Sequence, residues 1–296
     1  MFNILNKFLK KKNNNIIFEF SERKKKNNIE KIFNAIDDYS STSEIRYVGG
    51  CVRKVLNNEN IDDIDLAVNI DPAKVKEALE KKGIKYYETG IDHGTITAVI
   101  ENDKYEITSL RSDISTDGRH AKVKFTNDWL KDAQRRDFTI NSIYSDKSGN
   151  LFDPFDGKKD LKNGKVIFIG DIENRIKEDY LRILRYLRFF SIYSQDDHKL
   201  KVKKILKKNI KGIKKISHER LLDEFKKILK SNILVKLCDD EFSLEMIKFI
   251  FPQFINIDSV KKFNQFNKNR INEMDFCFIL SLLIIDGTDN LDYFNY

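Results

Sequence analysis

The sequence predicts an α+β fold, with a head of short strands and helices followed by an all-α remainder. Short β-rich runs recur between residues 45 and 169, whereas from Ile172 onward the apolar residues follow helical spacing and β-rich runs are absent. The chain has 296 residues, of which 41% are hydrophobic, so it is long enough to bury a sizeable core. These observations place the boundary between the two parts near residue 171.

The predicted elements of the head follow one another closely. Apolar residues at helical spacing predict a helix over 28–39, and an Asn102-Asp103 turn between two β-rich runs predicts a hairpin over 93–110. The polar segment 111–122 contains one glycine and is expected to be a mobile loop. Further strands are expected at 45–48, 64–68, 151–156 and 166–169, and further helices at 127–135 and 138–144.

Composition excludes several classes of protein. No run of 18 apolar residues occurs, so no membrane span is expected, and the most apolar stretch, 276–285, is expected to form a buried helix. Cys51, Cys238 and Cys277 fit neither a disulfide framework nor a CxxC metal site, which indicates a reducing compartment and a cytoplasmic location. Residues 1–27 are a Lys/Asn-rich arm without the charge order of a secretory signal, and a mitochondrial presequence stays open.

Positive charge is concentrated in one segment. The chain carries a formal net charge of +8, and residues 199–230 alone contain 13 Lys or Arg against three acidic residues, a balance of +10. Each phosphate that such a segment neutralises releases condensed counterions, so the block suits a polyanion such as nucleic acid. A solvated helix face in a lysine-rich protein is the alternative.

Four motifs carry the candidate chemistry. In the first, Gly49-Gly50-Cys51-Val52-Arg53, a strand ends in two glycines and a helix begins. Glycine lets the backbone approach a phosphate closely, the helix N-terminus offers unpaired N–H groups, and Arg53 can clamp a triphosphate. An ordinary turn is the alternative interpretation.

The second motif is Asp63-Ile64-Asp65. Residues i and i+2 of a strand point to the same face, so both carboxylates project together while Ile64 and Leu66 pack behind them. Two like charges this close repel each other, and two hard oxygen ligands suit Mg²⁺. A solvated acidic edge strand is the alternative.

The third motif is RRDFTIN at residues 135–141. Asp137 or Thr139 can cap a helix that begins here, which would place Arg135 and Arg136 at its electrostatically unfavourable N-terminal end. Cations held at that end indicate an anionic ligand, and a surface arginine pair is the alternative.

The fourth motif, EDYLRILRYLRF at residues 178–189, has the spacing of a helix. Asp179, Arg182 and Arg185 lie three residues apart and are expected to share one face. Arginine donates hydrogen bonds and aspartate accepts them from the exocyclic amine of cytosine or adenine, so the pair can read a base edge. A salt-bridged helix face is the alternative.

In this order and at these spacings, the motifs resemble those of the bacterial tRNA nucleotidyltransferase and poly(A) polymerase family, the class II CCA-adding enzymes. The family pattern GGxVRD, DxD, RRDFTIN, DPxxGxxDL and EDxxRxLRxxRF is met here by GGCVRK, DID, RRDFTIN, DPFDGKKDL and EDYLRILRYLRF. A further similar stretch, ISHERLLDEF, follows at residues 216–225. The resemblance therefore covers residues 45 to 230 of the chain.

The resemblance implies an architecture and a reaction. It implies a polymerase-β-like nucleotidyltransferase head over 28–171, a helical neck over 172–230 and a partial helical body over 231–296. The 3′-hydroxyl of an RNA would attack the α-phosphate of CTP or ATP and release pyrophosphate, assisted by two Mg²⁺ ions. The expected partner is the 3′ end of tRNA, and no protein partner is inferred.

The resemblance also assigns residues. Asp63 and Asp65 match the magnesium ligands, Glu106 is a candidate third carboxylate, and residues 111–123 fall where the family has a flexible loop that switches from C to A addition. The residues that match nucleotide contacts are Gly49, Gly50, Arg53 and Arg136 for the phosphate side, and Asp179, Arg182, Arg185 and Arg188 for the base.

Two departures from the family pattern flank the phosphate turn: Lys54 stands where the family usually has Asp, and Asn58 where it usually has Gly. Family members often carry a longer helical C-terminal region, so the part that grips the tRNA elbow is expected to be shortened or cut off here. A poly(A) polymerase, a CC-adding or A-adding enzyme and a non-catalytic RNA-binding relative are the alternatives. The retained loop segment favours full CCA addition.

Overall fold

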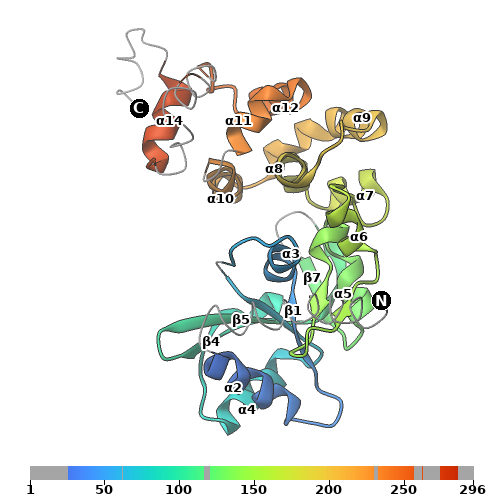
Figure 1. The fold of residues 1–296 in the computed structure, drawn as a ribbon, viewed down its shortest axis with the longest axis vertical. Helices are drawn as coiled ribbons and strands as arrows, with labels where there is room; N and C mark the ends of the chain where they lie inside the picture. Colours follow the sequence, from blue (N-terminus) through green and yellow to red (C-terminus); the bar gives the residue numbers. More distant parts are fainter. Residues whose placement is uncertain are drawn as a thin grey trace, which may run out of the picture. The chain divides into compact units, whose positions relative to one another are not determined.

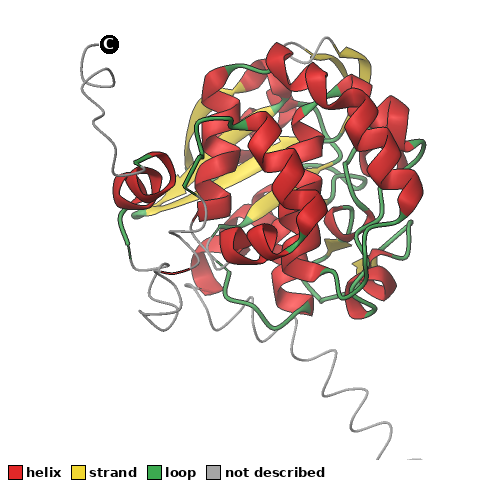
Figure 2. Cartoon of the chain, turned by 90° about the horizontal axis from the view of Figure 1, so that it is seen from above, coloured by secondary structure: helices red, strands yellow, loops and turns green. Residues whose placement is uncertain are grey.

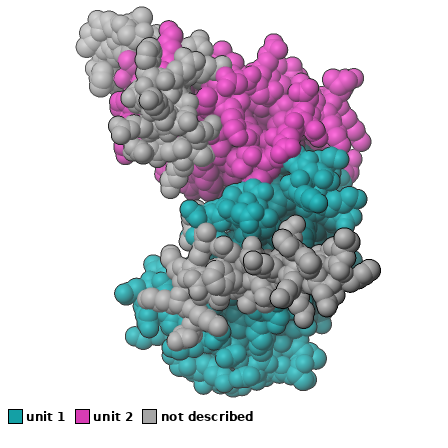
Figure 3. Space-filling model, in the orientation of Figure 1, with its two compact units in different colours: residues 1–116, 120–170 teal, residues 117–119, 171–296 magenta. Residues whose placement is uncertain are grey.

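The computed structural model describes residues 26–61, 63–116, 121–229, 233–256, 262 and 274–285. The chain divides into two compact units, and the division falls between Gly170 and Asp171 (Figure 3). The predicted arm at 1–27 lies outside the described residues except for its last two. The four-part division into arm, head, neck and body stays a prediction.

Unit 1 is built on a seven-stranded sheet with the order β3-β4-β5-β2-β1-β8-β9 (Figure 1). Strands β2 and β5 run parallel, and the other neighbouring pairs are antiparallel. The strands are β1 (Ile45–Val48), β2 (Asp65–Val68), β3 (Lys85–Gly90), β4 (Thr95–Ile100), β5 (Asp103–Ser109), β8 (Tyr144–Ser145) and β9 (Leu151–Phe152). The predicted strands at 45–48 and 64–68 and the predicted hairpin, here β4–β5, are confirmed.

Alternation along β1 and β2 divides the core of unit 1 between the two faces of the sheet. Tyr47 and Leu66 enter a large apolar cluster with the buried sides of α2, α3 and α4, whereas Val48 and Ala67 belong to a smaller cluster with Tyr144. Helices α2 and α4 lie side by side (Figure 1). The helical elements of unit 1 are α2 (Lys26–Asp37), α3 (Gly50–Leu56), α4 (Pro72–Lys81), η1 (Ile91–His93), α5 (Trp129–Gln134), η2 (Thr139–Asn141) and α6 (Gly157–Lys162).

Three predictions for unit 1 were wrong, and one predicted strand is shorter than expected. The segment expected to be a mobile loop is largely a two-stranded sheet of β6 (Arg111–Thr116) and β7 (Ala121–Phe125). The helix expected at 138–144 is a single 3-10 turn followed by β8, because Tyr144 and Ser145 pair with β1. The strand expected at 166–169 reduces to one bridge between Phe138 and Phe168, and the one expected at 151–156 shortens to β9.

In its described part, unit 2 consists of helices only, as predicted from residue 172 onward. Figure 2 shows the described helices of the chain in red and its strands in yellow. The helix expected at 276–285 is α14, which buries Ile279 and Leu283 but leaves Phe278 exposed. No helix among the described residues is long and apolar enough to cross a membrane. The helices are α7 (Ile172–Glu178), α8 (Leu181–Tyr193), α9 (Leu200–Asn209), η3 (Ile210–Lys215), α10 (His218–Leu229), α11 (Ile233–Asp239), α12 (Glu241–Ile250) and α14 (Phe276–Ile284).

Candidate active site

The carboxylates of the second motif lie at the beginning of β2. Asp65 is the first residue of the strand and Asp63 stands just before it, while Leu66 is buried and Ile64 packs against the large cluster, as the alternation predicted. Asp65 shares its side of the sheet with Ala67, so it faces the same side as the smaller cluster.

A third carboxylate lies beside Asp65. Glu106 of β5 is its register partner in the parallel pair, so both side chains leave the same face of the sheet. Burial is the largest cause that raises the pKa of Asp65 above its ordinary value, and the charges of Glu106 and Asp63 add to it. The positive charges of Arg136 and Arg53 act in the opposite direction and lower the pKa of Asp65.

The donor set fits a shared magnesium ion better than a closed metal cage. Among the described residues, no group of three His, Cys, Asp or Glu side chains is placed to hold a metal. Mg²⁺ is commonly bound through one or two carboxylates, with substrate phosphates and water completing its shell. The raised pKa of Asp65 reflects burial and like-charge repulsion, which a divalent cation would relieve.

The glycine turn of the first motif lies against the third motif. Gly49 has a φ of 67°, in the left-handed region that favours glycine, and α3 begins at Gly50 as predicted. A Cβ on Gly49 would lie 3.4 Å from Nη1 of Arg136 and 3.5 Å from the carbonyl oxygen of Asn141. The RRDFTIN segment therefore packs in van der Waals contact with the turn, and the positive φ, rather than lack of space, favours glycine at this position.

The departure at Asn58 leaves the backbone geometry intact. Asn58 has a φ of 57°, which explains why a glycine suits this position in the related pattern. Asparagine is one of the few other residues that adopt the left-handed region readily. Nothing in the structure explains the change to Lys54.

Arg53 is buried and held by the third motif. Its Nη1 donates a hydrogen bond to Oδ1 of Asn141, whose Nδ2 in turn donates to Oδ1 of Asp137 at 2.9 Å. Asp137 also accepts from the backbone N–H of Phe138 at 2.8 Å. Asp137 therefore orients Asn141 and Arg53, and the prediction that it caps a helix was wrong.

The electrostatic argument for Arg135 and Arg136 was also wrong. Helix α5 ends at Gln134, so the arginines follow its C-terminus, where the helix dipole favours positive charge. Both side chains pair with the buried carboxylate of Asp132. The position of Arg136 against the Gly49 turn, rather than a helix dipole, is what supports an anionic ligand.

The DPFDGKKDL segment has a supporting role that sequence reasoning did not assign. A Cβ on Gly157 would lie 2.2 Å from the carbonyl oxygen of Thr139, so only glycine allows α6 to approach the third motif. Asp160 accepts a hydrogen bond from the Thr139 hydroxyl at 2.7 Å. Asp153 accepts from the N–H groups of Gly157 and Lys158 at 2.7 and 2.8 Å, which caps α6. The sequence signal was the fixed DPxxG spacing.

In unit 2, the fourth motif is two helices rather than one. Asp179 lies in the break between α7 and α8, so the prediction that it shares a continuous helical face with Arg182 was wrong. Its Oδ1 accepts from the N–H of Leu181 at 3.2 Å, and its Oδ2 accepts from Nη2 of Arg220 at 2.8 Å. Arg182 instead donates to Glu178 at 2.7 Å.

Two residues of α10 complete this cluster, and sequence reasoning missed both. Arg220 holds Asp179, and buried Glu224 accepts from Nε of Arg188 at 2.5 Å and lies 3.7 Å from Nη1 of Arg185. Both belong to the ISHERLLDEF stretch, whose four-residue spacing of Arg and Glu was the available signal.

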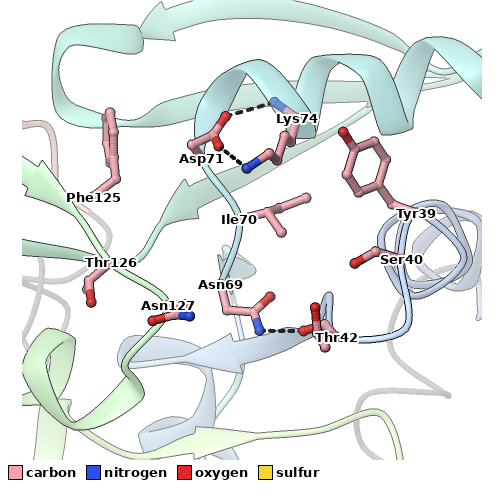
Figure 4. A pocket seen from close by; sticks show the side chains of 10 residues that line it. All are labelled: Tyr39, Ser40, Thr42, Asn69, Ile70, Asp71, Lys74, Phe125, Thr126 and Asn127. Carbon is pink, nitrogen blue, oxygen red and sulfur yellow. Dashed lines mark hydrogen bonds and ion pairs between the residues drawn. The ribbon is translucent and has the colours of Figure 1, made fainter.

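A separate hollow of about 670 Å³ lies in unit 1 and contains none of the predicted site residues (Figure 4). Tyr39 and Phe125 stand at opposite sides of it, and the Asp71–Lys74 pair borders it (Figure 4). Asn69, on its wall, directly follows β2 and is four residues beyond Asp65. Four residues correspond to about 13 Å of extended chain. The hollow is therefore distinct from the carboxylate edge.

Comparison with known proteins identifies the family. Residues 45–167 match the model of the poly A polymerase head domain, and residues 200–257 match that of the probable RNA and SrmB-binding site of polymerase A. The human mitochondrial CCA tRNA nucleotidyltransferase 1 is 44% identical over 76% of this chain and 52% of its own length. The CCA-adding enzyme of Lactobacillus johnsonii is 38% identical over 62% of this chain and 46% of its own.

The fold is shared with solved structures. The Bacillus stearothermophilus CCA-adding enzyme in complex with CTP superposes with a TM-score of 0.63 at 26% identity, over 77% of this chain and 56% of that one. A tRNA nucleotidyltransferase complexed with a primer tRNA and an ATP analogue gives a TM-score of 0.67 at 21% identity, over 89% and 78% of the two chains. The chain spans about half the length of the curated relatives it matches. The ordered motifs, the matching family models and the α+β head followed by helices show that the chain belongs to the tRNA nucleotidyltransferase and poly(A) polymerase family.

Proposed function

We propose that this protein adds C and A to the 3′ end of tRNA from CTP and ATP, without a nucleic-acid template, and releases pyrophosphate. The observation that carries the proposal is the meeting of three motifs in unit 1: Arg136 lies against the Gly49 turn, Cys51 of the first motif contacts the backbone of Asp65, and the charges of Arg53 and Arg136 act on the carboxylate of Asp65. The relatives named as CCA-adding enzymes support the choice of tRNA as the acceptor.

The chemistry requires positioning and neutralisation of charge more than a protein nucleophile. The RNA 3′-hydroxyl loses its proton to solvent and its oxygen forms a bond to the α-phosphorus, while the bond from that phosphorus to the oxygen that bridges to the β-phosphate breaks and pyrophosphate leaves. We assign Arg53 and Arg136 to the triphosphate, because guanidinium groups pair with phosphate oxygens and both groups are held in place by hydrogen-bonded partners. Gly49 and Gly50 allow the phosphates to approach the backbone at the start of α3.

Asp63 and Asp65 are the proposed Mg²⁺ ligands, and Glu106 is the candidate for a third. When bound, the two metal ions would lower the pKa of the 3′-hydroxyl and stabilise charge on the leaving oxygens. The contribution of the chain itself is to hold these carboxylates together on one face of β2 and β5.

Selection of the base is proposed for Asp179 and Arg182, with Arg185 and Arg188 completing the site. The hydrogen bond from Arg220 fixes the carboxylate of Asp179, so the carboxylate is presented in one orientation. A carboxylate accepts from the exocyclic amine that cytosine and adenine share and that uracil lacks.

Two other functions compete, and one assay separates them. The match to a poly A polymerase head domain favours a poly(A) polymerase, and Lys54 favours a non-catalytic RNA-binding relative. Labelled CTP and ATP, each alone and together, are supplied with tRNA that lacks its 3′ CCA. Our proposal predicts that both nucleotides together restore CCA and that addition then stops. Long ATP-only tails on arbitrary RNA would indicate a poly(A) polymerase, and no incorporation would indicate an RNA-binding protein.

We propose the cytoplasm as the location, on the basis of three free cysteines at Cys51, Cys238 and Cys277. Some relatives are named as mitochondrial, so cell fractionation that recovers the protein with mitochondria would contradict this proposal.

A further inference from the structure

Asp132 is a buried acid on α5 that the proposed reaction does not use directly. Its side chain is 1% exposed, and Ala133 beside it packs into the smaller cluster of unit 1. A buried carboxylate needs several hydrogen bonds or counter-charges to offset its desolvation. The structure provides them from four different groups, two on each oxygen.

One oxygen of Asp132 holds the arginine that we assign to the triphosphate. Oδ2 accepts from Nη2 and Nε of Arg136 at 3.1 and 3.3 Å, and from the hydroxyl of Tyr144 at 2.6 Å. The Tyr144 hydroxyl in turn accepts from Nε of Arg136 at 3.0 Å. Arg136 is thus held by a carboxylate and a phenol while its Nη1 lies next to the Gly49 turn.

The other oxygen of Asp132 binds the neighbouring Arg135 and the backbone of Arg111. Oδ1 accepts from Nε of Arg135 at 2.8 Å and from the backbone N–H of Arg111 at 3.3 Å. Arg111 is the first residue of β6, so the same carboxylate is bonded to the base of the β6–β7 hairpin. Although burial alone would raise the pKa of Asp132, Arg136 and Arg135 hold it well below its ordinary value, so the group is anionic at neutral pH.

We infer that Asp132, assisted by Tyr144, is a positioning residue that fixes the guanidinium of Arg136 for the triphosphate of the incoming nucleotide and ties it to the base of the β6–β7 hairpin. The inference rests on the proposed function of Arg136. An arginine side chain has several rotatable bonds. Hydrogen bonds to its Nε restrict these bonds, so the guanidinium is oriented before the phosphate binds. Asp132 and Tyr144 both bind that edge.

The test is equilibrium binding of CTP in the presence of Mg²⁺, with steady-state kinetics on tRNA beside it. Asp132→Asn is expected to raise the Kd of CTP by about tenfold or more, the scale of one charge-assisted hydrogen bond. Tyr144→Phe keeps the ring and removes only the hydroxyl, so it is expected to raise the Kd by about threefold to tenfold. In both variants KM should rise more than kcat falls.

A double-mutant cycle separates positioning from a general loss of structure. If Asp132 acts through Arg136, adding Asp132→Asn to Arg136→Ala should change the Kd of CTP by less than about twofold. The matched control is Asp128→Ala, which removes the carboxylate that accepts from Leu130 and Lys131 at the start of the same helix. This control should lower the melting temperature and leave the Kd of CTP unchanged.

Each outcome decides the inference. If Asp132→Asn does not fold, Tyr144→Phe carries the test with the same cycle against Arg136→Ala. The inference would be overturned if the folded variants bind CTP with unchanged affinity. It would also be overturned if Asp132→Asn raises the Kd of CTP equally in the wild type and in Arg136→Ala, or if the wild-type chain binds no CTP. A wild-type chain that binds CTP with the expected variant effects but extends no RNA would contradict the proposed function alone.

Discussion

Two arginines of unit 1 are oriented by buried acidic side chains, one directly and one through an asparagine. Arg53 reaches Asp137 through Asn141, and Arg136 reaches Asp132 directly. The sequence indicated both arginines through their motifs, but Asp132 stands outside RRDFTIN and was not predicted. The dipole argument for Arg136 was wrong because α5 ends before the arginines, and helix ends are hard to locate from sequence.

The carboxylate of Asp179 provides a prediction about base choice. Asp179→Asn adds an amide donor that tolerates the carbonyl of uracil, so UTP use relative to CTP should rise by about fivefold or more, the scale of one bidentate base contact. Arg220→Ala should shift the ratio in the same direction, because it releases the carboxylate. Asp171→Asn, which alters the cap of α7, is the control. The measurement is kcat/KM for CTP and UTP, and an unaltered ratio in both variants would remove base selection from this helix pair.

At the scale of elements, periodicity located the buried strands and failed for the polar ones. β1 and β2 were predictable because each alternates between two apolar clusters. β6 has only one apolar residue, Ile114, so no alternation distinguished it from a loop, whereas β7 alternates Ala121, Val123 and Phe125 with lysines, and that signal was missed. The break at Asp179 was also invisible, because apolar spacing continues from α7 into α8.

The contact between α6 and the third motif predicts a steric effect. Gly157→Ala would place Cβ on the backbone of Thr139, which cannot move independently, so unit 1 should lose about 1–3 kcal/mol of stability or more. Gly83→Ala is the control: its φ is 66° and no atom lies within 4 Å of the added Cβ, so only a backbone cost of about 1 kcal/mol is expected. Denaturant unfolding measures both, and an equal loss in the two variants would contradict the packing argument.

His198, which is bonded to residues of both α8 and α12, predicts a pH dependence of stability. His198 stacks on Phe190 and bonds to Tyr186, Asp240 and Ser243. Burial lowers the pKa of His198 below its ordinary value of 6.5, although the Asp240 charge opposes the shift and Lys203 adds to it. The folded state therefore binds fewer protons than the unfolded chain, so stability is complete above pH 6.5 and decreases as the pH falls below it.

Unfolding measured from about pH 7.5 to about pH 5.5 should show a loss of at most about 1.4 kcal/mol per pH unit from this group. His198→Gln should flatten that dependence, whereas His218→Gln, which changes an exposed histidine of the same unit, should leave it as in the wild type. Equal pH profiles for the wild type and His198→Gln would show that this group does not contribute.

At the scale of the whole molecule, charge distribution is the property that sequence predicts best, because it needs no knowledge of packing. The +10 segment at 199–230 contains α9, η3 and α10, and it overlaps the family match at 200–257. Some of its charges are compensated by acidic residues outside the segment, since Lys207 pairs with Glu245 at 2.6 Å and Lys208 with Glu173 at 2.8 Å. The remaining exposed lysines are the candidates for RNA binding.

A test of this segment changes four of its lysines to glutamate: Lys201, Lys204, Lys211 and Lys214. The variant should bind tRNA more weakly. The slope of log Kd against log salt should decrease by about 0.7–0.9 for each phosphate that the protein no longer neutralises. All four are exposed. The control reverses four exposed lysines of unit 1, which gives the same change in net charge: Lys85, Lys104, Lys159 and Lys162. The measurement is log Kd against log salt, and equal slopes for the two variants would assign the effect to net charge alone.

The central claim is that nucleotide transfer takes place at the carboxylates of β2. The measurement that tests it most directly is incorporation of labelled CTP and ATP into tRNA lacking CCA. It compares the wild type with Asp65→Asn, after thermal unfolding has shown that the two proteins have the same melting temperature. Loss of one charged ligand is expected to remove several kcal/mol of transition-state stabilisation, a decrease in turnover of about 100-fold or more. The account predicts CCA addition by the wild type and its near-complete loss in Asp65→Asn. Turnover near the wild-type rate in a folded Asp65→Asn would contradict it.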